Sequence, residues 1–274
     1  MGPLLLIGGH EEPRGAALEA FAAAAGKGGR IALLTAATEN PQVALRRYRE
    51  VFARLGLGEV LHVGAEDRSD CAQREAAQIV QGADGIFFTG GDQLRITSLI
   101  GGTPVEEAIH AARSRGAVVG GTSAGASAMT DTMIVGGHDE QAARRASIRM
   151  CPGLGLLRAA VVDQHFAQRG RINRLIAALA QNPGVLGIGI DEDTAILVQG
   201  GEHLDVLGSG TVTILDGRGA DLVEASERDV DRPVTLGGAS LFVLRQGYGF
   251  DLARRAALHT PRCAGKTSPV PVPH

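Results

Sequence analysis

The stretch AVVGGTSAGASAM, residues Ala117–Met129, shows the order of structural elements that recurs through the first half of this chain. It begins with a short apolar run, turns sharply at glycines and continues into small residues that tolerate a helix. Strand, tight turn and helix in direct succession are typical of an α/β protein. The stretches on its N-terminal side follow the same pattern.

Short apolar runs alternate with alanine-rich stretches of helical period through the first half of the chain. The apolar runs are Leu4–Ile7, Arg30–Ala36, Glu59–Val63, Gly85–Thr89 and Ala117–Gly121. The helical stretches between them are Ala16–Ala25, Gln42–Leu55, Gln73–Gln81 and Val105–Arg115. This alternation predicts an α/β fold with a doubly wound, mostly parallel sheet sandwiched by helices. Ligands of such sheets bind beyond the carboxyl ends of the strands.

The sequence pattern changes at Thr194, where alternating strands and helices give way to short predicted strands separated by glycine-rich turns. They are Thr194–Val198, His203–Val206, Thr211–Leu215 and Ser240–Leu244. Such spacing predicts strands that pair locally, as a β-rich C-terminal extension. Because no Pro/Ser-rich linker precedes them, we expect one domain over residues 1–265. The proline-rich end, residues 266–274, is expected to be a flexible tail.

Composition excludes several classes of function. The 274 residues carry 27 Lys and Arg against 30 Asp and Glu, a net charge of −3, which argues against binding to nucleic acid or to an anionic membrane. Aromatic residues make up only 3% and Trp is absent, so stacking platforms for single-stranded nucleic acid are not expected. Every apolar run is shorter than a membrane span, and the N-terminus has no signal-peptide pattern.

Cofactor and metal signatures are also missing from the sequence. The three cysteines, Cys71, Cys151 and Cys263, are far apart and form no CxxC pair, which argues against a zinc knuckle or a disulfide framework. The sequence contains no GxGxxG, P-loop or HExxH motif. We therefore expect a cytoplasmic protein that needs neither a nucleotide cofactor nor a metal ion.

The turn at Ser123 has the arrangement of a nucleophile elbow. Glycines on both sides permit the sharp bend that holds a serine hydroxyl out at a helix N-terminus. The backbone amide of Ala124 could then stabilise an oxyanion, and Gly91, beyond the neighbouring apolar run, could supply the second amide. A glycine-rich turn with an N-capping serine is the structural alternative, but the flanking strand and helix favour the nucleophile.

Of eight histidines, His165 is the best candidate for the general base, because it comes at the end of the apolar run Ala159–Val162 in a polar cluster. The acids Asp191, Glu192 and Asp193 follow the run Val185–Ile190, and one of them could orient the imidazole. Side chains alternate in direction, so all three cannot face the same site. The residues alone leave open which acid serves.

Arginines follow His165 closely in the sequence, at positions 169, 171 and 174. Arg171 and Arg174 are three residues apart and would share one face of a helix, with Arg169 just before it. Guanidinium groups beside a catalytic histidine indicate recognition of substrate carboxylates. An exposed basic helix is the alternative, and the position next to His165 favours substrate binding.

Four segments together resemble the cyanophycinases, in serine peptidase family S51, which also holds aspartyl dipeptidase. They are FTGGDQLRI (Phe88–Ile96), GGTSAGASAM (Gly120–Met129), DQHFAQRGRINRL (Asp163–Leu175) and GIGIDEDTAI (Gly187–Ile196). The resemblance runs from about Leu4 to Leu244. It implies a class I glutamine-amidotransferase-like, or flavodoxin-like, fold and a cofactor-free homodimer.

The resemblance also implies hydrolysis of cyanophycin, a polyaspartate with arginine on each β-carboxyl group, to β-Asp-Arg dipeptides. It assigns Ser123 as nucleophile, His165 as base and Glu192 as its carboxylate partner. The residues that it implies for the substrate site are Gln93, Asp163, Gln164, Arg169, Arg171 and Arg174. One segment departs from the pattern: Gly8–Pro13 has no lysine after its acidic pair, where relatives tend to carry one.

Three other functions are compatible with parts of the sequence. An aspartyl or isoaspartyl dipeptidase of the same family would act on dipeptides instead of polymer. An α/β-hydrolase esterase would use the order serine, acid, histidine, here Ser123, Asp193 and then His203 or His259. A binding or regulatory protein on this fold would leave Ser123 unreactive.

Overall fold

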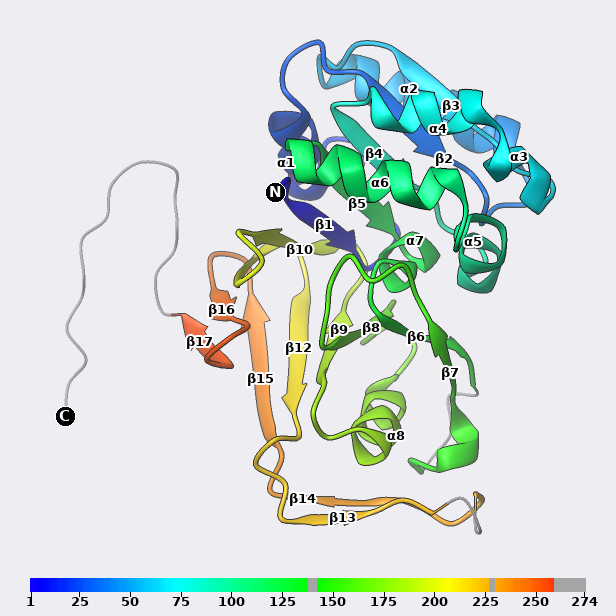
Figure 1. The fold of residues 1–274 in the computed structure, drawn as a ribbon. Coiled ribbons are helices and arrows are strands. Elements are labelled where there is room, and N and C mark those ends of the chain that lie inside the picture. The colour runs from blue at the N-terminus through cyan, green and yellow to red at the C-terminus, as the bar shows by residue number, and fades with distance from the viewer. Residues whose placement is uncertain (138–141, 227–229, 259–274) are drawn as a thin grey trace.

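A computed structural model describes residues 1–137, 142–226 and 230–258 of the chain. Within these residues the largest element is a nine-stranded sheet of order β17-β16-β11-β10-β1-β5-β4-β2-β3 (Figure 1). Five neighbouring strands from the N-terminal half are parallel. They are β1 (Leu4–Ile7), β2 (Ile31–Leu34), β3 (Val60–Val63), β4 (Gly85–Phe88) and β5 (Val118–Thr122). The predicted parallel α/β sheet is confirmed.

Helices cover both faces of the parallel strands. The helices before β8 are α1 (Ala16–Ala25), α2 (Pro41–Arg54), α3 (Arg68–Ala72), α4 (Arg74–Gln81), α5 (Gln93–Ile100), α6 (Pro104–Arg115) and α7 (Ala124–Ala128). Leu5 and Ile7 of β1 pack with α1 and α2, whereas Leu4 and Leu6 belong to the core on the other face, with α4, α5 and α6. Because successive side chains of a strand point to opposite faces, uninterrupted apolar strands can serve both layers.

The strands that complete the main sheet come from the C-terminal part and are antiparallel. They are β10 (Thr194–Gln199), β11 (His203–Gly208), β16 (Gly249–Asp251) and β17 (Ala256–Leu258). Strand β1 is the boundary between the two halves, since it pairs in parallel with β5 and antiparallel with β10. The first two strands of the expected β-rich extension, β10 and β11, therefore continue the sheet of the N-terminal half.

A second sheet of four strands, in the order β15-β12-β9-β8, packs below the first (Figure 1). Its strands are β8 (Ala160–Gln164), β9 (Leu186–Ile190), β12 (Thr211–Asp216) and β15 (Ser240–Arg245), and only β8 and β9 are parallel. Helix α8 (Ile172–Gln181) connects β8 to β9 and packs on this sheet. The two strands that precede His165 and Glu192 therefore lie outside the main sheet.

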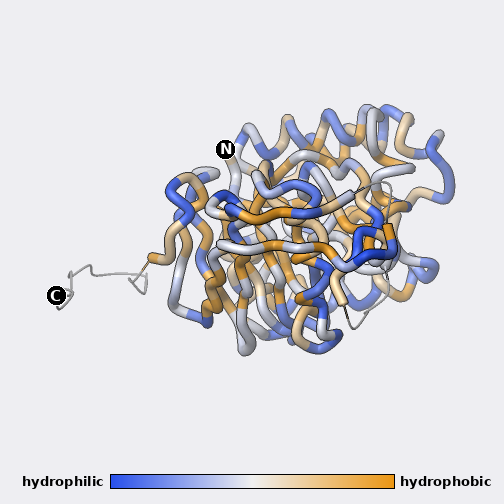
Figure 2. Tube along the Cα trace, turned by 90° about the horizontal axis from the view of Figure 1, so that it is seen from below, coloured by the Kyte–Doolittle hydropathy of each residue, from blue (hydrophilic) through white to orange (hydrophobic). Residues whose placement is uncertain are grey.

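Smaller elements complete the described fold. Strands β6 (Thr132–Gly136) and β7 (Arg149–Pro152) form one two-stranded sheet, and β13 (Leu222–Glu224) and β14 (Thr235–Gly237) form another. A 3₁₀ turn covers Arg145–Ser147. Hydrophobic segments run through the interior, with hydrophilic ones concentrated in loops and outer helices (Figure 2). None of the helices in the described part of the chain is long and apolar enough to cross a bilayer.

Most of the predicted strand and helix boundaries match the structure, but several details differ. Asp163 and Gln164 form the end of β8 and do not follow it, because their backbone continues the pairing with β9. The predicted helical stretches include neither α3 nor α5, although an N-cap at Asp92 is compatible with the sequence, and Asp92 caps α5 through a hydrogen bond from the amide of Leu94 (2.8 Å). The expected tail at 266–274 lies outside the described residues.

Candidate active site

Ser123 occupies the turn between β5 and α7 in a strained backbone conformation. Its φ of 52° and ψ of −115° are unusual for a residue with a side chain. The turn closes only around glycines: a Cβ on Gly121 would lie 2.7 Å from the carbonyl carbon of Gly125, and one on Gly125 would lie 2.7 Å from Phe88. The Ser123 amide donates to the carbonyl of Ile7 (2.9 Å), which ties the turn to β1.

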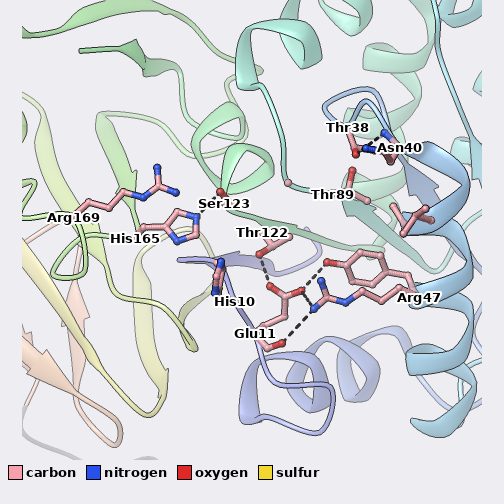
Figure 3. A pocket seen from close by; sticks show the side chains of 15 residues that line it. His10, Glu11, Thr38, Asn40, Arg47, Thr89, Thr122, Ser123, His165 and Arg169 are labelled. Atoms are coloured by element: carbon pink, nitrogen blue, oxygen red, sulfur yellow. Dashed lines mark hydrogen bonds and ion pairs between the residues drawn. The ribbon is translucent and has the colours of Figure 1, made fainter. Parts of the chain in front are cut away.

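His165 follows β8 and meets Ser123 across the gap between the two sheets. Its Nε2 lies 2.9 Å from Ser123 Oγ, within hydrogen-bond distance (Figure 3). The His165 amide donates to the carbonyl of Gly8 (2.9 Å), so the end of β1 holds both residues. The side chain is buried. A hydroxyl at this distance from an imidazole is the arrangement that nucleophilic catalysis requires.

Glu192 is the acid that meets the imidazole. Its Oε1 lies 2.7 Å from His165 Nδ1. The flanking acids are engaged elsewhere: Asp191 accepts hydrogen bonds from Ala167 and Thr211, and Asp193 from Glu12 and Ser209. The alternation of side-chain directions after β9 thus presents only the middle acid to the site.

The electrostatics favour a neutral base next to an ionised acid. Burial lowers the pKa of His165, and the positive charge of Arg169 lowers it further, against the opposing effect of Glu192. The hydrogen bond with His165 lowers the pKa of the Glu192 carboxyl. At neutral pH His165 can therefore accept the Ser123 proton, while Glu192 stabilises the imidazolium that results.

Two backbone amides adjoin the nucleophile. Ala124 begins α7 directly after Ser123, where helix amides lack intrahelical acceptors. The Gly90–Gly91 turn passes beside it, since a Cβ on Gly90 would lie 3.4 Å from Ser123 Cβ. Gly91 has a φ of 141° and its Cβ would lie 2.1 Å from the carbonyl oxygen of Ala37, so no other residue fits. Ala124 is thus adjacent to Ser123, and Gly91 follows the glycine that passes beside it; the role of these two amides as oxyanion donors stays a prediction.

A cavity of about 590 Å³ opens at Ser123 and extends to α2 (Figure 3). Arg169 lies beside His165 at one end, and Arg47 lies at the other. The residues that line it are Gly9, His10, Glu11, Thr38, Asn40, Val43, Ala44, Arg47, Tyr48, Thr89, Gly90, Thr122, Ser123, His165 and Arg169. Arg169 presents a cationic group beside His165, whereas the charge of Arg47 is paired with that of Glu11 (3.1 Å).

The wall of the cavity contains a buried carboxylate that sequence reasoning missed. Glu11 accepts hydrogen bonds from Thr122 (2.6 Å), Tyr48 (2.7 Å) and Arg47 (3.1 Å). Three donors, one of them charged, compensate its burial. Glu11 follows the carboxyl end of β1, so the rule that ligands bind beyond strand ends could have identified this loop.

The other predicted substrate residues lie in a network beside the cavity. Asp163 is buried and forms ion pairs with Arg171 (3.2 Å) and Arg174 (2.9 Å). Arg171 also donates to the side chain (2.7 Å) and to the carbonyl (2.6 Å) of Gln164. Gln93 donates to the carbonyl of Ile134 (2.7 Å). Of the six predicted residues only Arg169 lines the cavity, and contacts of the other five with substrate stay a prediction.

The geometry disfavours the esterase order. Asp193, its expected acid, accepts hydrogen bonds from the amide of Glu12 (3.1 Å) and the hydroxyl of Ser209 (2.8 Å), and from no histidine among the described residues. His203 lies in β11, opposite Gln199. His259 lies outside the described residues. The residues that are hydrogen-bonded to one another are Ser123, His165 and Glu192, so their order along the sequence is serine, histidine, acid.

The model of peptidase family S51 matches residues 4–206, which include Ser123, His165 and Glu192. The chain belongs to peptidase family S51. It is therefore a serine peptidase, and the interpretation as a binding protein without activity is set aside.

Curated relatives agree with this assignment. The chain is 38% identical over 218 residues to a cyanophycinase of Geminocystis herdmanii, with 79% of this chain and 80% of the relative covered. It is 36% identical over 262 residues to a cyanophycinase of Trichormus variabilis (93% and 87% covered) and 35% identical over 230 residues to one of Synechococcus elongatus (84% and 71% covered). The similarity thus extends over most of each protein.

Solved structures share the fold. A peptidase from an acI-B1 actinobacterium superposes with a TM-score of 0.68 at 24% identity, covering 92% of this chain and 97% of its own. A putative peptidase E from Listeria monocytogenes superposes with a TM-score of 0.54 at 17% identity, covering 77% and 100%. At these identities the likeness concerns the fold alone.

Proposed function

We propose that this S51 peptidase hydrolyses cyanophycin to β-Asp-Arg dipeptides. The observation that carries the chemistry is the continuous chain from Ser123 through His165 to Glu192, with distances of 2.9 and 2.7 Å. The similarity to cyanophycinases over most of the chain supports the substrate. Arg169, which lines the cavity beside His165, supports it too, because every branch of the polymer carries a carboxylate.

In the first half of the reaction, His165 Nε2 takes the proton of Ser123 as Oγ attacks a backbone carbonyl carbon of the polymer. The oxyanion of the tetrahedral intermediate accepts hydrogen bonds from the amides of Gly91 and Ala124, each typically worth about 3 kcal/mol in the transition state. His165 then gives its proton to the leaving amine. The products of this half are an acyl-enzyme, which carries the fragment with the attacked carbonyl, and a free amine, which is the other fragment. One of the two fragments is the dipeptide and the other is the shortened polymer.

In the second half, water replaces the leaving amine. His165 takes a proton from water, the hydroxide attacks the acyl carbon, and the proton returns to Ser123 Oγ as the ester bond breaks. Glu192 stays ionised throughout and stabilises the imidazolium in both halves. No group outside the chain is consumed except water.

Substrate recognition divides between a direct contact and supporting contacts. Arg169 lines the cavity beside His165, where its guanidinium can bind the carboxylate of an arginine branch. Arg171 donates to the carbonyl of Gln164, the residue before His165, and pairs with Asp163. We propose that this buried network shapes the site by holding the end of β8.

The resemblance to the family leads us to propose a cytoplasmic homodimer in which residues 1–265 form one domain. Sedimentation equilibrium of the purified chain tests the dimer. A mass of one chain at assay concentration would contradict it, without bearing on the catalytic proposal.

The decisive experiment is incubation of the purified chain with insoluble cyanophycin, with clearing and β-Asp-Arg release as readouts. We expect Ser123→Ala to lose at least about 10⁴-fold in rate. Ser127→Ala is the matched control, because Ser127 lies on the helix that follows Ser123 and its hydroxyl donates to the carbonyl of Val162 in β8 (3.2 Å), away from the reaction. Normal dipeptide release by Ser123→Ala would contradict the mechanism. Cleavage of aspartyl dipeptides without clearing of polymer would support the dipeptidase instead.

A further inference from the structure

A second imidazole, that of His10, lies beside the carboxylate of Glu192, and the proposed mechanism does not use it. His10 follows the Gly8–Gly9 end of β1, and its Nδ1 is 3.6 Å from Oε2 of Glu192. Its ring lies 5.3 Å from that of His165, centroid to centroid, at 89°. Glu192 therefore has one imidazole at each carboxylate oxygen. Figure 3 shows His10 beside His165 at the rim of the cavity.

These three side chains form a set of transition-metal ligands. One ligand atom from each of His10, His165 and Glu192 lies within 4.8 Å of the others. Zinc binds histidine nitrogens and carboxylate oxygens at about 2.0–2.2 Å, so neighbouring ligands of a tetrahedral ion are about 3.3 Å apart. His165 Nδ1 lies 2.7 Å from Glu192 Oε1, slightly closer than that distance, and His10 Nδ1 lies 3.6 Å from the other carboxylate oxygen, Oε2.

We propose that His10, His165 and Glu192 bind a zinc ion, and that this ion inhibits the enzyme reversibly. Two imidazoles and a carboxylate are a donor set that zinc prefers over magnesium or calcium. A water molecule completes the tetrahedron. The site is inhibitory and not a cofactor site, and its effect on turnover rests on the proposed serine mechanism.

The ion can enter with small movements of the exposed partners. The zinc ion takes the position of the proton between His165 Nδ1 and Glu192 Oε1, which requires the carboxylate to move back by several tenths of an ångström. The side chains of His10 and Glu192 are 73% and 27% exposed, so both can adjust. His165 is held by its buried ring and by the carbonyl of Gly8.

Inhibition follows from the tautomer of the base. A neutral imidazole has one N–H and one lone pair. When the Nδ1 lone pair binds zinc, the single proton must reside on Nε2, which it reaches by exchange with water. Nε2 then faces Ser123 Oγ as a donor and cannot accept its proton. Zinc at this site therefore prevents His165 from acting as the general base, although His165 keeps its position beside Ser123.

Arg169 opposes the ion. Its charge is close enough to His165 and Glu192 to lower the pKa values of both groups. The same charge repels a divalent cation, more strongly at low ionic strength. We expect Arg169→Gln to bind zinc more tightly than the unaltered enzyme.

The test measures zinc binding separately from turnover. Zinc binding is measured by competition with a chromogenic chelator in Ser123→Ala, which keeps all three ligands, so this arm needs no substrate. Inhibition by zinc is measured in the active enzyme, normalised to the activity of each variant without metal, and reversed with EDTA. We expect one zinc ion per chain, inhibition that EDTA reverses, and no inhibition by magnesium.

The deciding variant is His10→Ala, made both in the active enzyme and in Ser123→Ala. Loss of one of three protein ligands should weaken zinc binding and inhibition at least about 10- to 100-fold. Even the loss of a residue that only hydrogen-bonds to a metal ligand typically lowers metal affinity by that factor. His110→Ala, an exposed histidine on α6, is the matched control and should change neither. Equal zinc affinity with and without His10 would overturn the proposal. So would zinc binding that leaves the active enzyme uninhibited.

The two proposals can fail separately. An enzyme that never cleaves cyanophycin would contradict the proposed function, while the chelator competition in Ser123→Ala would still decide the zinc site. An enzyme that clears cyanophycin and binds no zinc would overturn only the inference drawn here.

Discussion

Gly9 contacts the ring of His165 so closely that no side chain fits between them. A Cβ on Gly9 would lie 2.3 Å from Cε1 and 2.7 Å from Nε2 of the imidazole, and the φ of Gly9 is +107°. The backbone beyond β1 thus forms one wall of the space in which the base is held. The orientation of His165 toward Ser123 depends on this glycine.

The first prediction concerns Gly9→Ala. The methyl group must push the imidazole away from Ser123, and a displacement of about 1 Å can cost about 10²-fold in rate. We expect kcat to fall by at least that factor while the chain remains folded by circular dichroism. Gly116→Ala is the control, with a similar φ of +119° and open space around its Cβ, so it bears the backbone strain without the clash. Equal kcat values for the two variants would contradict the prediction.

Glu192→Gln tests the orienting acid. The amide keeps the size of the side chain but cannot stabilise the imidazolium, and the analogous change in other serine peptidases costs about 10⁴-fold in kcat. We expect a loss of that order in dipeptide release. Asp193→Asn should stay within about 10-fold of the unaltered enzyme, because Asp193 bonds to Glu12 and Ser209 instead. The opposite ranking would support the esterase order.

The pH profile reports the environment of His165. Burial lowers the pKa of the free-enzyme imidazole below 6.5, and only the neutral form accepts the Ser123 proton. We therefore expect kcat/KM, measured with EDTA present, to be full at neutral pH and to fall through a midpoint below 6.5 as the pH decreases. The charge of Arg169 also lowers this pKa, so Arg169→Gln should move the midpoint to higher pH. A midpoint that moves to lower pH in that variant would contradict the assignment.

Asp163→Asn separates a structural role from substrate binding. Asp163 is buried between Arg171 and Arg174, and its loss leaves two buried guanidinium groups without their carboxylate. We expect the free energy of unfolding, measured in urea, to fall by about 3–5 kcal/mol. Glu50→Gln removes the exposed ion pair with Arg54 and should cost at most about 0.5 kcal/mol. An Asp163→Asn chain of unchanged stability but raised KM would assign Asp163 to direct substrate contact.

The local features of the site could be read from the sequence because they depend on neighbours along the chain. The elbow at Ser123 needs only a buried strand, flanking glycines and a following helix, and all three are contiguous. The order of His165 and Glu192 after two further apolar runs was also visible. The assignment of Glu192 among the three acids depends on the family resemblance. The alternation of side chains separates Glu192 from Asp191 and Asp193, but it does not say which of them points toward His165.

Other features depend on packing between segments that are distant in sequence. Arg169 and Arg171 are two residues apart, yet Arg169 lines the cavity and Arg171 is buried against Asp163. A basic pattern cannot distinguish these environments, because the turn before α8 decides which side chain faces inward. Likewise His10 and Glu11 are adjacent, and only the fold places one beside Glu192 and the other against Thr122.

The parallel strands, the helices between them and the strained serine turn follow from the sequence alone, because hydrophobic period and glycine stereochemistry act over a few residues. That β8 and β9 belong to a separate sheet, and that the end of β8 lies against β1, depends on long-range packing. Strand pairing between distant segments depends on the burial of whole layers at once. For that reason the distance between Ser123 and His165, on which activity depends, is a property of the folded chain.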